Sequence, residues 1–331
     1  MIKALGLFYT FACTATCKMC VTNSSPFRKE KMSFEEAKKY IQETASLSSI
    51  GWISLNGGEP LLYYEEICKL LKFAKTIGKK TKISTNGFWA EDHRTAKDII
   101  RQLERAGLDF ISLSTDVYHT EFIGFENIKY CLEAIEGSGL MRELTIVVDR
   151  KTQKEALKLA QSLGEKNKLP TYGKVMFFNE NTALEDLKCH TAINIAPLQP
   201  FGRGIGLLDQ CFFQKFEKYR NKPCSVVGRY PYVMPGGEIY WCCNFFRPER
   251  GYVKNFRLGT FKCDSLIDIE QKLQENPLVN FLSTQGPGNF PWKPFLSADD
   301  QIYQDEFASM CHLCIAMFTK KAKPYLQKEQ T

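Results

Sequence analysis

Short apolar runs alternate with amphipathic stretches from residue 1 to about residue 205 of this 331-residue chain. Each apolar run has the length of a buried strand, and the stretch after it repeats its apolar residues at helical spacing. Strands joined by helices pair in parallel, so the alternation predicts a barrel-like α/β domain. The expected strands span residues 4–9, 52–55, 81–84, 110–113, 144–148 and 193–198, and the expected helices span residues 33–47, 64–77, 92–106, 125–136 and 153–163.

Local signals mark the ends of several expected helices. Ser33 and Glu36 have the spacing of a capping box, and a glycine follows three of the helices. The sixth strand is open to an alternative, because residues 174–178 also form a short apolar run that fits this place.

Three cysteines, Cys13, Cys17 and Cys20, follow the first expected strand in one short loop. Active groups of parallel α/β barrels gather at the carboxyl ends of the strands, and this loop occupies such a place. A [4Fe-4S] cluster normally takes a thiolate at each corner, so three cysteines leave one iron for an exogenous ligand. A zinc site or a disulfide is the alternative, although structural zinc sites usually pair two short Cys/His units and this loop offers one.

Charge and composition narrow the partners of such a site. The formal net charge of +7 is spread through the chain without a dense lysine or arginine block. That distribution gives little support to nucleic acid as a substrate, whereas an acidic peptide is compatible with it. No stretch approaches the length of a membrane span and no cleavable apolar segment precedes the first strand, so we expect a cytoplasmic protein without a membrane partner. In that compartment the 13 cysteines are expected to be buried thiols or metal ligands.

The spacing C-x3-C-x2-C resembles the signature of the radical S-adenosylmethionine (radical SAM) enzymes. A second motif, Asn56-Gly57-Gly58-Glu59-Pro60, follows the second strand and resembles the GGE motif of that family. Its glycines let backbone approach a ligand closely, and its carboxylate can accept hydrogen bonds from an ammonium. The resemblance implies a partial (β/α)6 TIM-like barrel over residues 1–205. It also implies that SAM chelates the bare iron and is cleaved by one electron to a 5'-deoxyadenosyl radical.

The polar loops after the third and fourth strands resemble family loops that line the SAM pocket. Short hydroxyl, amide and carboxylate groups suit the methionyl carboxylate and the ribose hydroxyls. A polar cap of the strand end is the alternative for each residue, and a structural role is the alternative for Tyr118 and His119. The residues expected to bind SAM are Gly57, Gly58, Glu59, Ser84, Asn86, Ser114 and Asp116.

The second half of the chain carries a separate set of cysteines around an expected β-hairpin at residues 232–241. The order of one cysteine, a hairpin, another cysteine and C-x2-C resembles the twitch domain, the shortened relative of the SPASM domain. This resemblance implies an auxiliary [4Fe-4S] cluster in a domain of residues 206–331, although zinc satisfies four thiolates equally well. The ligands are then Cys224, Cys242, Cys311 and Cys314, and the cysteines left as buried thiols are Cys68, Cys131, Cys189, Cys211 and Cys263.

Cys242 and Cys243 are adjacent, so in an extended segment their side chains point to opposite sides. If Cys242 is the ligand, the Cys243 thiol is left over and can give a hydrogen atom to a substrate carbon radical at the barrel mouth. Returning hydrogen to the face opposite the abstraction inverts a carbon centre. The assembled motifs resemble the radical SAM epimerases that install D-residues in ribosomally made peptides.

That resemblance implies a ribosomally synthesised precursor peptide as substrate and an electron donor of the flavodoxin or ferredoxin type. The assignment within the Cys242–Cys243 pair is also open to reversal. Alternatives within the enzymes are a peptide crosslinking or thioether-forming radical SAM enzyme and a twitch dehydrogenase. A non-catalytic iron–sulfur electron carrier or a zinc scaffold belongs to a different class, which has no need of a SAM pocket.

Overall fold

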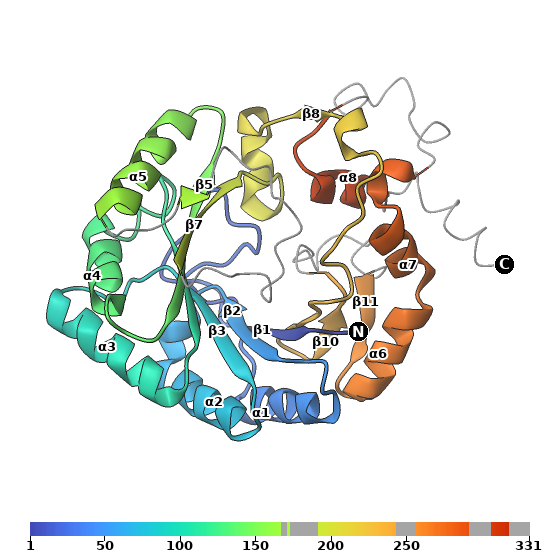
Figure 1. The fold of residues 1–331 in the computed structure, drawn as a ribbon, viewed down its shortest axis with the longest axis horizontal. Helices are drawn as coiled ribbons and strands as arrows, with labels where there is room; N and C mark the ends of the chain where they lie inside the picture. Colours follow the sequence, from blue (N-terminus) through green and yellow to red (C-terminus); the bar gives the residue numbers. More distant parts are fainter. Residues whose placement is uncertain (167–170, 173–190, 243–255, 291–305, 318–331) are drawn as a thin grey trace.

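The computed structural model describes residues 1–166, 171–172, 191–242, 256–290 and 306–317. Ten strands form one sheet in the order β11-β10-β9-β1-β2-β3-β4-β5-β7-β6 (Figure 1). The strands at its centre are β1 (Ala4–Thr10), β2 (Trp52–Gly57), β3 (Lys80–Thr85), β4 (Phe110–Ser114), β5 (Met141–Val148) and β7 (Thr191–Pro197). The helices between them are α1 (Phe34–Glu43), α2 (Tyr64–Thr76), α3 (His93–Ala106), α4 (Phe125–Ile135) and α5 (Gln153–Lys166).

The predicted parallel α/β barrel is confirmed. The six central strands form five parallel pairs, which are β1–β2, β2–β3, β3–β4, β4–β5 and β5–β7. Helices α1 to α5 cover the outside of the curved sheet (Figure 1). Every residue of β1 is buried, as expected for a strand that is covered on both faces. The alternative sixth strand at residues 174–178 lies outside the described residues.

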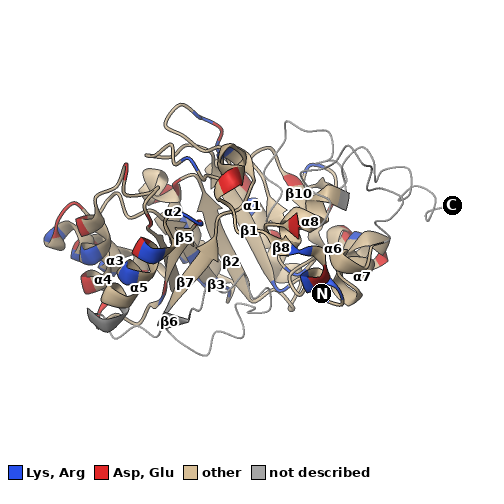
Figure 2. Ribbon diagram, turned by 90° about the horizontal axis from the view of Figure 1, so that it is seen from above, with Lys and Arg blue, Asp and Glu red and all other residues tan. Residues whose placement is uncertain are grey.

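The predicted helix signals are also confirmed where they can be checked. The Ser33 hydroxyl accepts from the Glu36 amide, and the Glu36 carboxylate accepts from the Ser33 amide, which completes the capping box of α1. Gly107 ends α3 with a φ of 101°, a conformation that favours glycine. Figure 2 shows basic and acidic residues mixed over α3, α4 and α5. Within the described residues, no helix combines the length and apolarity needed to cross a membrane.

The inner face of the barrel carries charged and hydrogen-bonded side chains, in contrast to the packed apolar interior of a closed eight-stranded barrel. Glu143 on β5 accepts hydrogen bonds from Ser112 on β4 at 3.0 Å and from Asn194 on β7 at 3.1 Å. Its carboxylate also pairs with Lys82 on β3 at 3.3 Å. A charged and hydrogen-bonded interior suits a bound polar molecule better than a purely structural core.

The C-terminal strands extend the same sheet. The remaining elements are β6 (Thr171–Tyr172), β8 (Gln214–Lys215), β9 (Tyr232–Val233), β10 (Glu238–Tyr240), β11 (Arg257–Thr260), β12 (Glu306–Phe307), α6 (Leu266–Glu275), α7 (Pro277–Thr284) and α8 (Met310–Met317). The predicted hairpin is confirmed, because β9 and β10 pair antiparallel. Strand β9 also pairs in parallel with β1, with Gly6 opposite Tyr232. A separate domain from residue 206 stays a prediction.

The direction of the hairpin decides where Cys242 lies. Since β9 is parallel to β1 and β10 runs back, β10 ends toward the amino end of β1. There the Trp241 carbonyl accepts from the Gly228 amide, and the neighbouring Arg229 carbonyl accepts from the Lys3 amide. Cys242 is thus at the opposite end of β1 from the three-cysteine loop. At about 3.3 Å per residue, β1 separates the two by about 20 Å.

Candidate active site

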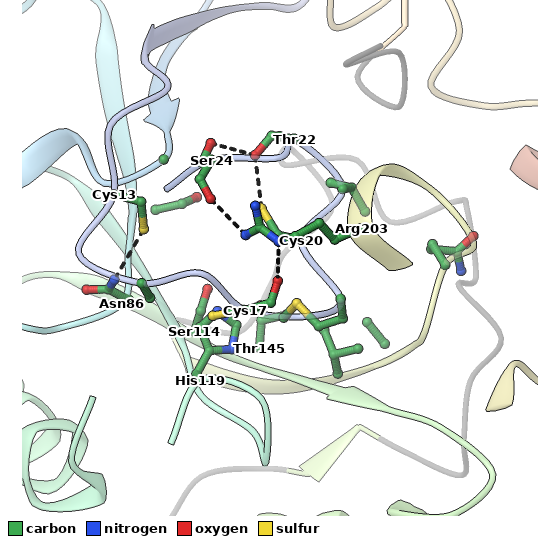
Figure 3. Close-up of a pocket in the computed structure, with 18 of the residues that line it drawn as sticks. Cys13, Cys17, Cys20, Thr22, Ser24, Asn86, Ser114, His119, Thr145 and Arg203 are labelled. Carbon is green, nitrogen blue, oxygen red and sulfur yellow. Dashed lines mark hydrogen bonds between the residues drawn. The ribbon is translucent and has the colours of Figure 1, made fainter. Parts of the chain in front are cut away.

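A cavity of about 330 Å³ lies where the predicted cysteine loop meets the carboxyl ends of the parallel strands (Figure 3). The side chains of Cys13, Cys17 and Cys20 all line it. Its volume is at the lower end of the range for small-molecule sites. The structure thus brings together the three candidate ligands of the first cluster at the edge where active groups of such barrels gather.

The cysteine loop is folded around this cavity by its own hydrogen bonds. The Cys13 amide donates to Ser25 O at 3.1 Å, and the Cys20 amide donates to Cys17 O at the same distance. The side-chain nitrogen of Asn86 lies 3.8 Å from the Cys13 sulfur, and the Thr22 hydroxyl lies 3.2 Å from the Cys20 sulfur. These polar neighbours suit sulfurs that carry negative charge.

The donor set fits an iron–sulfur cluster with one open corner. Burial raises the pKa of Cys13 to about 11 and that of Cys17 to about 12, so these thiols need a metal to stay ionised at neutral pH. Within the described part of the chain, no three His, Cys, Asp or Glu side chains converge on a single metal ion. A cubane instead takes its thiolates at separate corners, and the three cysteines around a cavity have this arrangement.

The Gly-Gly-Glu motif packs the end of β2 against the cysteine loop. The Gly58 amide donates to Thr10 O at 2.7 Å, and the Glu59 amide donates to Ala12 O at 2.8 Å. A Cβ on Gly58 would lie 2.1 Å from Ala12 O, so the close approach requires glycine. Gly57 and Gly58 both line the cavity.

Glu59 does not lie where a carboxylate that binds the ammonium group of SAM was expected. Its side chain is fully buried and is not among the described residues that line the cavity. The carboxylate accepts from the Leu61 amide at 3.0 Å, the Thr85 hydroxyl at 2.9 Å and the Asn86 amide at 2.8 Å. Burial raises its pKa to about 7. Glu59 thus holds the end of β3 and orients Asn86, which does line the cavity.

Of the polar residues expected after β3 and β4, Ser84, Asn86 and Ser114 line the cavity and Asp116 does not. The buried Asp116 carboxylate accepts from the Tyr118 and His119 amides at 2.9 and 3.0 Å. It also accepts from the Val147 amide at 3.1 Å and pairs with His119 Nδ1 at 2.9 Å. The side chain that reaches the cavity is His119, for which the sequence favoured a structural role over a functional one.

Replacing Asp116 with asparagine is expected to destabilise the protein by about 2 to 3 kcal/mol. One carboxylate oxygen, which accepts from two buried donors, becomes an NH2 group that cannot accept from them. Denaturant unfolding measures the loss of free energy of unfolding. Faster hydrogen exchange at the Val147 amide would show that the loss arises at the contact between Asp116 and β5. Asp98→Asn, on the exposed face of α3, is the matched control and is expected to stay within about 0.5 kcal/mol of wild type. Equal stability of the two variants would contradict this role of Asp116.

Sequence reasoning did not identify several lining residues that come from other elements. They include Thr145 on β5, and Gln199 and Arg203 in the segment after β7. The only sequence signal was the run Pro200-Phe201-Gly202-Arg203-Gly204 at the end of the sixth strand.

The C-terminal cysteines are only partly described. Cys224, Cys242 and Cys314 pack at the border of the main core, and Cys311 is half-buried on α8. Cys243 lies outside the described residues, as does Cys189. The expectation that the remaining cysteines are buried is confirmed for Cys131 and Cys211, but it is wrong for Cys263, which is exposed just after β11, and Cys68 on α2 is half-buried. None of the described cysteines forms a disulfide.

Comparison with known proteins gives relatives along most of the chain. The putative peptide biosynthesis protein YydG of Bacillus subtilis is 23% identical over 337 positions, which cover 98% of this chain and 97% of YydG. A probable GTP 3',8-cyclase of Methanothermobacter thermautotrophicus is 28% identical over 289 positions, which cover 83% of this chain and 90% of the cyclase.

Solved structures share the fold at low sequence identity. Native anSMEcpe with bound AdoMet has a TM-score of 0.54 and 15% identity, with 99% of each chain covered. Streptococcus suis SuiB bound to S-adenosylmethionine has a TM-score of 0.51 and 17% identity, with 85% of this chain and 67% of SuiB covered. The sequence profile of the Radical SAM superfamily matches residues 7–183. The profile, the barrel and the three-thiol cavity agree: this chain belongs to the radical SAM superfamily, whose members bind a [4Fe-4S] cluster and SAM.

Proposed function

We propose that this radical SAM enzyme is a peptide epimerase that converts an L-residue of a ribosomally synthesised precursor peptide to its D-form. The observation that carries the proposal is the placement of Cys242, and hence the start of the Cys242–Cys243 segment, at the opposite end of β1 from the three-cysteine loop. Epimerisation needs hydrogen removed on one side of a carbon and returned on the other.

The polar interior between the two ends offers a place for the substrate. Tyr232 of the hairpin reaches into it over Gly6, where a Cβ would lie 2.6 Å from the tyrosine ring. The Tyr232 hydroxyl accepts from the Asn56 amide at 3.0 Å. Together with Lys82 and Glu143, these groups present donors and acceptors of the kind that peptide backbone uses.

The sequence placed the hydrogen-donating thiol at the barrel mouth, whereas Cys242, which precedes the proposed donor, lies at the other end of β1. The first cluster is held by Cys13, Cys17 and Cys20, and SAM by the cavity beside them. When bound, this pair supplies the 5'-deoxyadenosyl radical that removes Hα. The S–H bond of Cys243 then breaks, and its hydrogen forms the new Cα–H bond.

The sulfur radical left on Cys243 needs one electron and one proton to become a thiol again. An auxiliary [4Fe-4S] cluster would supply that electron, and its ligands would be Cys224, Cys242, Cys311 and Cys314. A flavodoxin- or ferredoxin-type donor supplies the electrons, and water supplies the proton. The peptide keeps its mass, because one hydrogen leaves and one returns.

The relatives support a peptide substrate more than the alternatives. YydG is named as a peptide biosynthesis protein and aligns along nearly the whole of this chain. An anSMEcpe structure with AdoMet and the Kp18Cys peptide has a TM-score of 0.53 to this chain. The second curated relative favours GTP as the rival substrate, so the test includes GTP.

The test incubates the reconstituted enzyme with SAM, reductant and candidate peptides in deuterated water. Thiol hydrogens exchange with water, so the expected product carries one deuterium at an inverted Cα, and its mass is unchanged in ordinary water. Cys243→Ala is expected to keep Hα abstraction and to lose inversion, whereas Cys263→Ala, which alters an exposed cysteine, is expected to behave as wild type.

Three results would count against the proposal, and a fourth would exchange the roles of the two cysteines. A D-residue formed by Cys243→Ala would exclude this thiol as the donor. A crosslinked or dehydrogenated peptide would assign the site to another radical reaction. Consumption of GTP in place of every peptide would move the substrate to nucleotides. Loss of the auxiliary cluster in Cys243→Ala but not in Cys242→Ala would reverse the roles of the two cysteines.

A further inference from the structure

The segment after β7, which contains Pro200-Phe201-Gly202-Arg203-Gly204, has no role in the function described so far. We propose that Arg203 is a positioning residue for the first cluster: it clamps the backbone of the cysteine loop and supplies the positive charge at that site. This inference rests on membership of the radical SAM superfamily and not on the choice of substrate.

Arg203 makes three hydrogen bonds to the cysteine loop. Its backbone amide donates to Cys20 O at 2.9 Å. Its Nε donates to Cys17 O at 2.9 Å, and one terminal nitrogen donates to Ser24 O at 2.7 Å (Figure 3). Arg203 therefore donates to the backbone carbonyls of two candidate cluster ligands, Cys17 and Cys20, and to that of Ser24 at the end of the loop. Hydrogen bonds from a guanidinium are stronger than neutral ones.

The glycines beside Arg203 bring its backbone this close to the loop. Gly202 has a φ of 55°, and a Cβ on it would lie 2.3 Å from Cys20 O. A Cβ on Gly204 would lie 2.4 Å from Gln199 O. A larger residue at position 202 would push the segment away from the loop, and a larger residue at position 204 would distort the turn itself. The turn is thus shaped to place Arg203 against the cysteines.

The charge of Arg203 is also distinctive at this site. Among the described residues that line the cavity, it is the only lysine or arginine, and none is an aspartate or glutamate. A cluster with three thiolates becomes more negative when it accepts an electron. A nearby positive charge stabilises the reduced form and raises the reduction potential.

The clamp on the loop backbone and the positive charge can be tested separately. Lysine keeps the charge of Arg203 but lacks the planar guanidinium that donates to two carbonyls at once. The test compares Arg203→Gln and Arg203→Lys with Arg101→Gln, which alters an exposed arginine on α3. Hydrogen exchange of the cluster-free full chain reports on the loop at the Cys13 and Cys20 amides. Potentiometric titration, followed by electron paramagnetic resonance, measures the midpoint potential of the first cluster. The signal of that cluster is recognised because its spectrum changes when SAM is added.

In both Arg203 variants we expect loop amides to exchange about ten times faster or more, since each lost bond to a charged donor is worth about that factor. The amides of β4 are expected to keep wild-type exchange. The midpoint potential is expected to fall in Arg203→Gln and to stay near wild type in Arg203→Lys. Arg101→Gln is expected to change neither quantity.

Three outcomes would overturn the proposal. Wild-type exchange and potential in Arg203→Gln would show that the loop needs neither the clamp nor the charge. Wild-type loop exchange in Arg203→Lys would show that the fork is not needed. Equally faster exchange in β4 and the loop would show a general loss of stability in place of positioning.

Discussion

Replacing Cys17 with alanine is expected to remove about four iron atoms per chain and to abolish formation of 5'-deoxyadenosine from SAM. Two thiolates leave two corners open and do not hold a cubane against solvent, and buried Cys17 is the middle ligand of the loop. Iron and labile sulfide are measured per chain after anaerobic reconstitution. The nucleoside is quantified after incubation with SAM and a strong reductant.

Cys131→Ala is the matched control, because it also removes a buried thiol, here on α4 and away from the cavity. It is expected to keep full iron content and nucleoside formation. The cofactor assignment would fail if Cys17→Ala retained the same iron, sulfide and cleavage as this control. Zinc in the wild-type protein without labile sulfide would argue for the alternative metal site.

Replacing Glu59 with alanine is expected to lower the free energy of unfolding by about 3 to 5 kcal/mol, because three buried donors lose their acceptor. Those donors are the Leu61 amide, the Asn86 amide and the Thr85 hydroxyl. Chemical denaturation of the cluster-free chain measures this loss without a contribution from metal. Glu91→Ala, at an exposed position before α3, is the control and is expected to change stability by less than about 0.5 kcal/mol.

The loss should also depend on pH. Burial raises the pKa of Glu59 from 4.5 to about 7, so the folded chain binds this proton more tightly than the unfolded chain does. The stabilisation that comes from this difference is complete below about pH 4.5 and disappears as the pH rises through 7. The gap between wild type and Glu59→Ala is therefore expected to narrow over that interval. A gap that widened with pH would show that the carboxylate is ionised in the fold.

The positions of the strands were predictable because burial on both faces demands apolar runs. Strand β5 shows the limit of that signal. It begins at Met141, three residues before the predicted start, because Arg142 and Glu143 interrupt the apolar run. These residues pair with β7 and Glu143 is satisfied inside the barrel, so the neighbouring strands decide where β5 begins.

The residue types of the site were also predictable, but their directions were not. Spacing along the chain brought Cys13, Cys17 and Cys20 to one cavity, as local geometry requires. It could not show that Glu59 and Asp116 turn into the protein, since that depends on donors supplied by neighbouring loops. Arg203 and Cys17 are 186 residues apart in the sequence. Sequence patterns do not show which residues meet at such a separation.

The pairing of β9 with β1 also bears on how much of this chain can be dispensed with. In a barrel that stopped after β7, β1 would be an outermost strand, with one row of its backbone amides and carbonyls open to other molecules. Such rows promote aggregation by strand addition. The C-terminal hairpin covers part of that row at Gly6 and Leu7, so a shortened protein would lose this protection against self-association together with its last cysteines.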